Sequence, residues 1–168
     1  MVATEIMENL IQEYGIIKSF APLPNPVLGH YCYDGKYNVI LINEKIQHHE
    51  RLYRTVLSEE LGHYKTSVGD LTPSRLMSYH NKIMVNKKEL LALKWATEFL
   101  IPTGGLLDLL QRELVTSLEE LSSYYQVTEK FMLMKFEFMA KVKPVWRLEE
   151  DRYLNLYKLP SVFIMKKY

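Results

Sequence analysis

The sequence contains one cysteine, almost no excess of charge and no long hydrophobic run. A lone Cys32 excludes an internal disulfide and a cysteine-rich zinc site. The formal net charge of +1 gives no electrostatic reason to expect nucleic acid or a membrane surface as a partner. No apolar run approaches the roughly 20 residues that a membrane-spanning helix requires. These features favour a cytoplasmic protein that acts on neither nucleic acid nor membrane.

The pattern of apolar and turn-forming residues predicts an α+β protein that is mainly helical, with a small sheet. The 168 residues, 48% of them hydrophobic, are enough for one domain with a real core. Boundaries are expected after residues 102 and 143, which gives a core over 1–102, a helical segment over 103–143 packed on it, and a tail over 144–168. Helices are expected over 4–18, 46–65, 87–100, 106–114, 117–125 and 128–140, a hairpin over 31–43 turning at Asp34-Gly35, a loop over 67–74, and short strands over 153–157 and 162–165.

Residues 59–63 read Glu-Glu-Leu-Gly-His, which differs from the zinc-protease pattern H-E-x-x-H only at its first residue. On a helix, Glu59 and His63 are four residues apart, so both side chains can reach one metal ion. Glu60 occupies the position of the carboxylate that activates water in such enzymes. The projected helix places Glu59 and His63 on the same face as Leu52 and Val56, where a carboxylate needs a compensating partner.

The predicted helix over 87–100 has a second acid on its apolar face. Glu89 projects with Ala92, Leu93, Ala96 and Leu100, whereas Glu98 projects to the opposite side. A third metal ligand would explain an inward-facing acid, because zinc sites accept carboxylate oxygen and catalytic sites use three protein ligands. The alternative is that these acids and His63 are ordinary residues of solvated helix faces. From the residues alone, the two interpretations are about equally supported.

Two spaced blocks of the sequence resemble the ImmA/IrrE family of metallopeptidases. The first block runs from Leu57 to Tyr64 with Thr66-Ser67 and Gly69-Asp70, and the second runs from Glu89 to Ala96 with Leu100-Ile101-Pro102. The branch found in prophages and mobile elements, with its E-E-x-G-H variant, is the most similar. The strand over 38–43 and the helical segment over 117–139 fit the same family.

The resemblance implies a zincin-like fold and a metal-dependent endopeptidase that cleaves a partner, a helix-turn-helix repressor of a prophage or mobile element. It implies Glu59, His63 and Glu89 as metal ligands and Glu60 as the general base for a metal-bound water. Zn²⁺ is the expected cofactor, and Mn²⁺ or Fe²⁺ are candidates because a second carboxylate favours harder ions. Substrate is expected to add as a strand along the edge of the hairpin, at the outward amides of residues 37–42.

Two other functions compete with this interpretation. A zincin-like regulator without catalysis would act by binding its repressor or toxin partner. The second competing function is DNA binding through residues 106–140, because the three short helices predicted there resemble a helix-turn-helix. The segment from 116 to 140 has four acidic and two basic residues, which is the wrong balance for contacts to phosphate. Its aromatic residues and methionines are better explained by packing or by a partner helix.

Overall fold

The computed structural model describes residues 2–66, 79–113 and 117–166. The chain divides into two compact units, Val2–Ala96 and Thr97–Tyr168, and each is described by itself. This division falls inside a helix, a few residues before the predicted boundary at 102. The boundary predicted after 143 stays a prediction, and the loop predicted over 67–74 lies outside the described residues.

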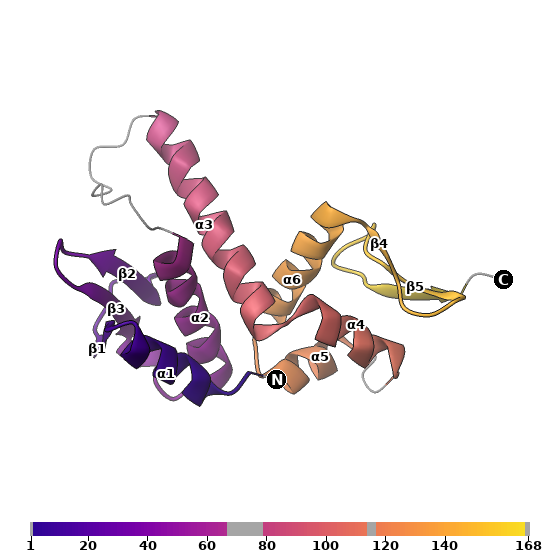
Figure 1. Cartoon of the computed structure of the whole chain (residues 1–168), viewed down its shortest axis with the longest axis horizontal. Coiled ribbons are helices and arrows are strands. Elements are labelled where there is room, and N and C mark those ends of the chain that lie inside the picture. The colour runs from indigo at the N-terminus through magenta and orange to yellow at the C-terminus, as the bar shows by residue number, and fades with distance from the viewer. Residues whose placement is uncertain (1, 67–78, 114–116, 167–168) are drawn as a thin grey trace. The chain divides into compact units, whose positions relative to one another are not determined.

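The first unit contains helices and one small sheet (Figure 1). The sheet has the order β1-β3-β2, with β3 in the middle, parallel to β1 and antiparallel to β2. Ile40 and Ile42 are alternate residues of β3, so they lie on one face of the sheet, and both are fully buried. Helix α2 contacts β2 and β3, and α1 contacts α2 and β1. The elements in chain order are α1 (Thr4–Glu13), β1 (Ile17–Ala21), β2 (Gly29–Tyr33), β3 (Asn38–Asn43), a 3₁₀ turn (Glu44–Ile46), α2 (Glu50–Thr66) and α3 (Tyr79–Leu100), which crosses into the second unit.

The first helix is shorter than the sequence predicts. It ends at Glu13, and Gly15 takes a φ of +62°, a left-handed conformation that stops helices. The prediction of helix over 14–18 was therefore wrong, since Ile17 and Lys18 belong to β1. The residues of β1 are not alternately buried and exposed, so its apolar and polar residues do not alternate with the period of two by which a strand is recognised in a sequence.

The hairpin of β2 and β3 confirms the sequence prediction, with the turn one residue further on. Asp34 N–H donates to Tyr37 O, so Gly35 and Lys36 are the central turn residues. The Asp34 carboxylate accepts from the amides of Lys36 and Tyr37, which lowers the pKa of Asp34. The expectation that residues 37–42 offer a strand edge was wrong, because β3 lies between two strands. The edge strands of this sheet are β1 and β2.

Helix α2 buries a different face from the one that the projection predicts: of Leu52, Val56, Glu59 and His63, only Val56 is buried, and the other three are half-buried. Tyr53, Val56, Leu57 and Leu61 are buried at intervals of three and four residues. Glu50 in its first turn and Lys65 in its last turn complement the helix dipole.

The second unit carries helices α4, α5 and α6 and a second sheet of order β4-β5-β6 (Figure 1). The predicted capping box is confirmed: the Ser117 hydroxyl accepts from Glu120 N–H, and the Glu120 carboxylate accepts from Ser117 N–H. Phe131 and Phe136 are fully buried, so the apolar residues of this segment pack as predicted. The elements are α4 (Thr103–Gln111), α5 (Leu118–Tyr125), α6 (Glu129–Val142), β4 (Val145–Arg147), β5 (Arg152–Asn155) and β6 (Phe163–Lys166).

Across the described residues, no single helix is long and apolar enough to cross a membrane. One bent pair in the described part of the chain, Lys87–Leu100 with Thr103–Gln111, reaches that length and composition when the two helices are counted together.

Candidate metal centre

The three residues with predicted metal-ligand roles lie together in the first unit. One donor atom from each of Glu59, His63 and Glu89 can be chosen so that all lie within 4.8 Å of one another. Glu59 and His63 come from successive turns of α2, and Glu89 comes from α3. Among the residues that the structure describes, no other group of histidine, cysteine and carboxylate side chains is this compact.

His63 and Glu89 contact each other directly. His63 Nε2 lies 3.2 Å from Glu89 Oε2, and the two side chains are 16% and 48% exposed. Glu89 is therefore at the rim of the site and not buried among its apolar neighbours. Ala92, Ala96 and Leu100, on the same face of α3, are fully buried, as the projection predicted.

Glu60 is the buried acid of the site, with an exposure of only 6%. Burial raises its pKa to about 7, and the negative charges of Glu59 and Glu89 act in the same direction. The positive charge of His63 and a hydrogen bond from the Tyr31 backbone N–H oppose the shift. This value belongs to the metal-free protein; a divalent cation held by the neighbouring donors would favour the carboxylate form of Glu60, which is the form that accepts a proton.

The pKa values of His63 and Glu89 shift in opposite directions. Burial on its own lowers the pKa of His63, but the hydrogen bond to Glu89 and the charges of three carboxylates raise it overall. The hydrogen bond from His63 lowers the pKa of Glu89 despite partial burial. Both shifts favour an imidazolium–carboxylate pair in the metal-free protein.

The close approach of α2 and α3 depends on a residue whose role the sequence analysis missed. A Cβ placed on Gly62 would lie 2.4 Å from the backbone oxygen of Ala92. Such a contact does not occur in proteins, so only glycine allows this packing. The approach brings Glu89, one turn before Ala92, within reach of His63. In the sequence, this close approach is indicated by two features: the glycine that precedes His63 in the motif, and the alanines on the helix that packs against it.

A cavity of about 250 Å³ opens onto these carboxylates. Its lining includes Gly29, His30 and Tyr31 of β2 together with the four site residues Glu59, Glu60, His63 and Glu89. Side chains alternate along a strand, so His30 points to the opposite face of the sheet from Tyr31, and Tyr31 packs edge-on against Tyr64 of α2. His30 is exposed, as are His48 and His49, whereas the side chain of His80 lies outside the described part of the chain.

The donor set fits a divalent metal ion. Zinc bonds nitrogen and carboxylate oxygen at about 2.0–2.2 Å, which places neighbouring ligands of a tetrahedral site roughly 3.4 Å apart. The distance of 3.2 Å between His63 Nε2 and Glu89 Oε2 already matches this spacing. The other donor atoms lie within 4.8 Å, and small side-chain rotations would bring them to the same spacing. Three protein ligands leave one position open for water or substrate, as catalytic sites require.

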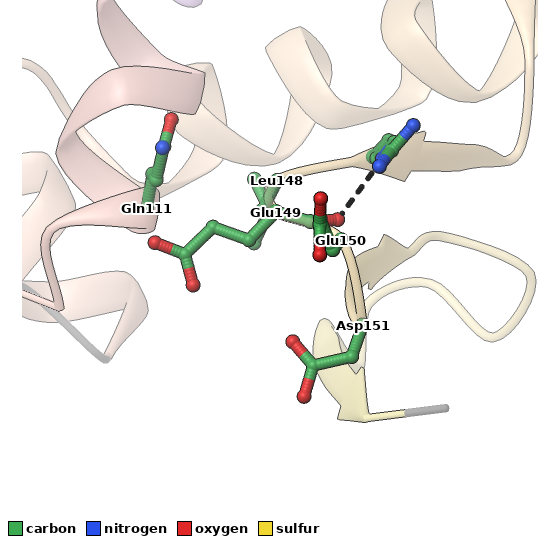
Figure 2. Close-up of a pocket in the computed structure, with 6 residues that line it drawn as sticks. Gln111, Leu148, Glu149, Glu150 and Asp151 are labelled. Atoms are coloured by element: carbon green, nitrogen blue, oxygen red, sulfur yellow. Dashed lines mark hydrogen bonds between the residues drawn. The ribbon is translucent and has the colours of Figure 1, made fainter. Parts of the chain in front are cut away.

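A cavity in the second unit offers no comparable chemistry. It has a volume of about 620 Å³ and surrounds the turn between β4 and β5 (Figure 2). Its three acids, Glu149, Glu150 and Asp151, are consecutive residues of this turn (Figure 2), and among the described residues they do not form a compact donor group like that of the first unit. Glu149 is paired with Arg152, with 3.3 Å between Oε2 and Nη1. This pocket therefore does not collect ligands for a cation.

Comparison with protein families gave a match that covers most of the chain. The model of Peptidase_M78, described as the IrrE N-terminal-like domain, matches residues 11–137. Neither the curated proteins nor the solved structures gave a match. The match includes all four residues of the site and agrees with the zincin-like, mainly helical α+β architecture. The chain therefore belongs to the Peptidase_M78 family, which supports a metallopeptidase-type function.

Proposed function

We propose that this protein is a metal-dependent endopeptidase that cleaves a helix-turn-helix repressor of a prophage or mobile element in the cytoplasm. The observation that supports it best is the buried acid Glu60, which lines the same cavity as the Glu59-His63-Glu89 donor set. Membership of a peptidase family supports peptide hydrolysis. The repressor as substrate rests on the resemblance to the branch found in mobile elements.

The residues have distinct roles in this proposal. Glu59, His63 and Glu89 hold the metal ion, which when bound acts as a Lewis acid toward water and the scissile carbonyl. Glu60 accepts a proton from the attacking water and returns it to the leaving amine. Its burial excludes bulk water from the carboxylate, and the Tyr31 amide keeps one of its lone pairs engaged.

The identity of the metal follows from the charge of the ligands. Two carboxylates and one imidazole give a net charge one unit more negative than two imidazoles and one carboxylate. Oxygen donors also suit harder ions, so Mn²⁺ and Fe²⁺ compete with Zn²⁺ better here than at a two-histidine site. The added negative charge makes bound water less acidic, which moves the pH optimum upward.

A metal-loading and cleavage experiment tests the proposal. Protein purified without chelator or tag-derived metal is analysed for metal content and loaded separately with Zn²⁺, Mn²⁺ and Fe²⁺. It is then incubated with helix-turn-helix repressors encoded next to its gene. We expect one equivalent of metal, lost in His63→Ala and Glu89→Ala, and a defined cleavage product seen by mass spectrometry. Glu60→Gln should bind metal and repressor but cleave nothing.

The competing proposal is a regulator that binds its partner without catalysis. The ion pair between His63 and Glu89 favours it, because the two side chains satisfy each other without a metal ion. In that case no metal binds, and Glu60→Gln leaves the effect on the repressor intact. That result, combined with an intact repressor in every metal-loading condition, would contradict the endopeptidase.

A further inference from the structure

Strand β2 approaches α2 most closely at Gly29. A Cβ placed there would lie 2.4 Å from Glu60 Oε1 and 2.5 Å from Val56 Cγ1, both shorter than any real contact. The described glycines with positive φ are Gly15 and Gly35, so the backbone conformation of Gly29 is open to any residue. A side chain at residue 29 is therefore excluded by lack of space, because the Glu60 carboxylate of the proposed general base occupies the place of the Cβ.

The backbone of the same strand holds this carboxylate from a second direction. In the ladder with β3, Asn43 N–H donates to Leu28 O and Asp34 N–H donates to Tyr37 O. Backbone groups alternate along an antiparallel strand, so Tyr31, three residues from each of Leu28 and Asp34, directs its N–H away from β3. Its outward N–H donates to the Glu60 carboxylate. The edge of β2 therefore provides a hydrogen-bond donor and an empty space for one carboxylate.

We propose that Gly29 is a positioning residue: the missing side chain and the Tyr31 amide together fix the Glu60 carboxylate at the cavity. Glu60 Oε1 is the end of a flexible side chain, whereas the backbone of β2 is held by its ladder with β3. An added methyl group at residue 29 therefore displaces the carboxylate by roughly 1 Å, the difference between 2.4 Å and an ordinary contact. The strand itself keeps its place.

Displacement of this size matters for catalysis, since a misplacement of about 1 Å can lower a rate by about 100-fold. This consequence rests on the proposed function, whereas the position of the carboxylate does not. The two can therefore be tested separately.

Amide hydrogen exchange tests the position without any substrate. The Tyr31 amide faces away from β3, so its protection comes from Glu60, whereas the amides of His30 and Cys32 are protected by β3. Exchange is measured by NMR in metal-free protein for the parent, Gly29→Ala and Glu60→Ala. Val56→Ala with Gly29→Ala removes the second clash, and Gly104→Ala is the matched control, because a Cβ there meets nothing within 4 Å.

We expect the Tyr31 amide to exchange at least 10-fold faster in Gly29→Ala, in Glu60→Ala and in the double variant with Val56→Ala. Gly104→Ala should behave as the parent does. The amides of His30 and Cys32 should keep their rates throughout. Parent-like protection of Tyr31 in Gly29→Ala would overturn the proposal, and so would faster exchange at His30 and Cys32, which would mean a disrupted strand.

The catalytic consequence is read from steady-state kinetics on a repressor that the metal-loaded parent cleaves. Gly29→Ala should lower kcat by 10- to 100-fold, leave KM within twofold and retain one equivalent of metal. An unchanged kcat would overturn the positioning role. If the parent cleaves nothing, the proposed function fails, and the exchange rates still decide whether Gly29 positions Glu60.

Discussion

His63 Nε2 and Glu89 Oε2 lie 3.2 Å apart although they come from different helices. This distance suits two ligands of one metal ion as well as it suits an ion pair. Metal binding therefore has to break the His63–Glu89 contact but needs little movement of either helix. The affinity for metal is then set by the chemistry of the three donors and by how closely α2 and α3 approach.

The first prediction concerns the residue that departs from the zinc-protease pattern. Glu59→His should bind Zn²⁺ at least 10-fold more tightly and lose relative preference for Mn²⁺, because imidazole replaces a harder, charged donor. If the enzyme is active, its pH optimum should also fall. Isothermal titration with each ion measures the affinities, and weaker zinc binding by the variant would contradict this account of the site.

The second prediction concerns the contact between the helices. Gly62→Ala places a methyl group against the Ala92 backbone, which cannot rotate away as a side chain can. We expect a loss of about 1–3 kcal/mol in the free energy of unfolding, the usual cost of overpacking. Metal affinity should fall as well, since α3 carries Glu89 away from His63. Denaturant titration and metal titration measure the two effects.

The control for this variant is another helical glycine. Gly104 lies in α4, where a Cβ would meet nothing within 4 Å. Gly104→Ala should leave metal affinity unchanged and stabilise the protein by up to about 1 kcal/mol through helix propensity. Equal effects of the two substitutions on metal affinity would rule out the close approach as the cause.

The sequence predicted the site better than it predicted the sheet. The pairing of Glu59 with His63 follows from helical spacing, which is local, and the role of Glu60 follows from the motif. Periodicity predicted that Glu89 faces inward, whereas its side chain is 48% exposed, and its contact with His63 joins two helices, which spacing along one helix does not predict. The order of strands is not local, so nothing in the hairpin residues showed that β1 would pair with β3 and turn it into a central strand. The close contacts of Gly29 with Glu60 and of Gly62 with Ala92 also join distant segments, and neither glycine lies in a turn, so the sequence did not reveal why glycine is needed there.

The third prediction is a pH dependence of the metal-free protein. The pKa of Glu60 rises from 4.5 to about 7 on folding, so the folded state binds more protons than the unfolded chain between these values. The free energy of unfolding should therefore fall by on the order of 3 kcal/mol from pH 4.5 to pH 7. Glu60→Gln should remove this fall.

His63 and Glu89 shape the flanks of this profile. The raised pKa of His63 adds a loss of stability above pH 6.5, which should persist in Glu60→Gln. The lowered pKa of Glu89 adds stability that is lost only below pH 4.5. Urea titrations in chelator at several pH values measure the profile. An identical slope in parent and Glu60→Gln would contradict a neutral buried carboxyl group.

The fourth prediction replaces the wrong strand edge with the observed one. If substrate adds to β2, its outward amides matter, and the alternation that directs Tyr31 outward does the same for Tyr33. Tyr33→Pro should raise KM several-fold and leave the fold intact. Cys32→Pro removes an amide from the ladder with β3 and should unfold the sheet. Peptide kinetics and circular dichroism separate the two. An unchanged KM in Tyr33→Pro would place the substrate elsewhere.

The fifth prediction concerns a buried cation in the second unit. Lys135 is only 3% exposed, and its ammonium contacts Glu98 and Thr103 Oγ1, the latter at 2.8 Å. Glu98→Ala leaves that charge without its carboxylate and α4 without the acceptor for Thr103 N–H. The loss expected for a buried pair is about 3–5 kcal/mol, and we expect about 1–3 kcal/mol because Glu98 is half exposed.

Removing the charge itself should have the opposite outcome. Lys135→Met keeps the apolar length of the side chain and avoids the cost of burying an ammonium group, so the free energy of unfolding should stay constant or rise. Lys130→Met, at an exposed position on the same helix, should change it by less than about 0.5 kcal/mol. A large loss in Lys135→Met would show that the ion pair itself stabilises this unit, because the packing of the side chain is preserved.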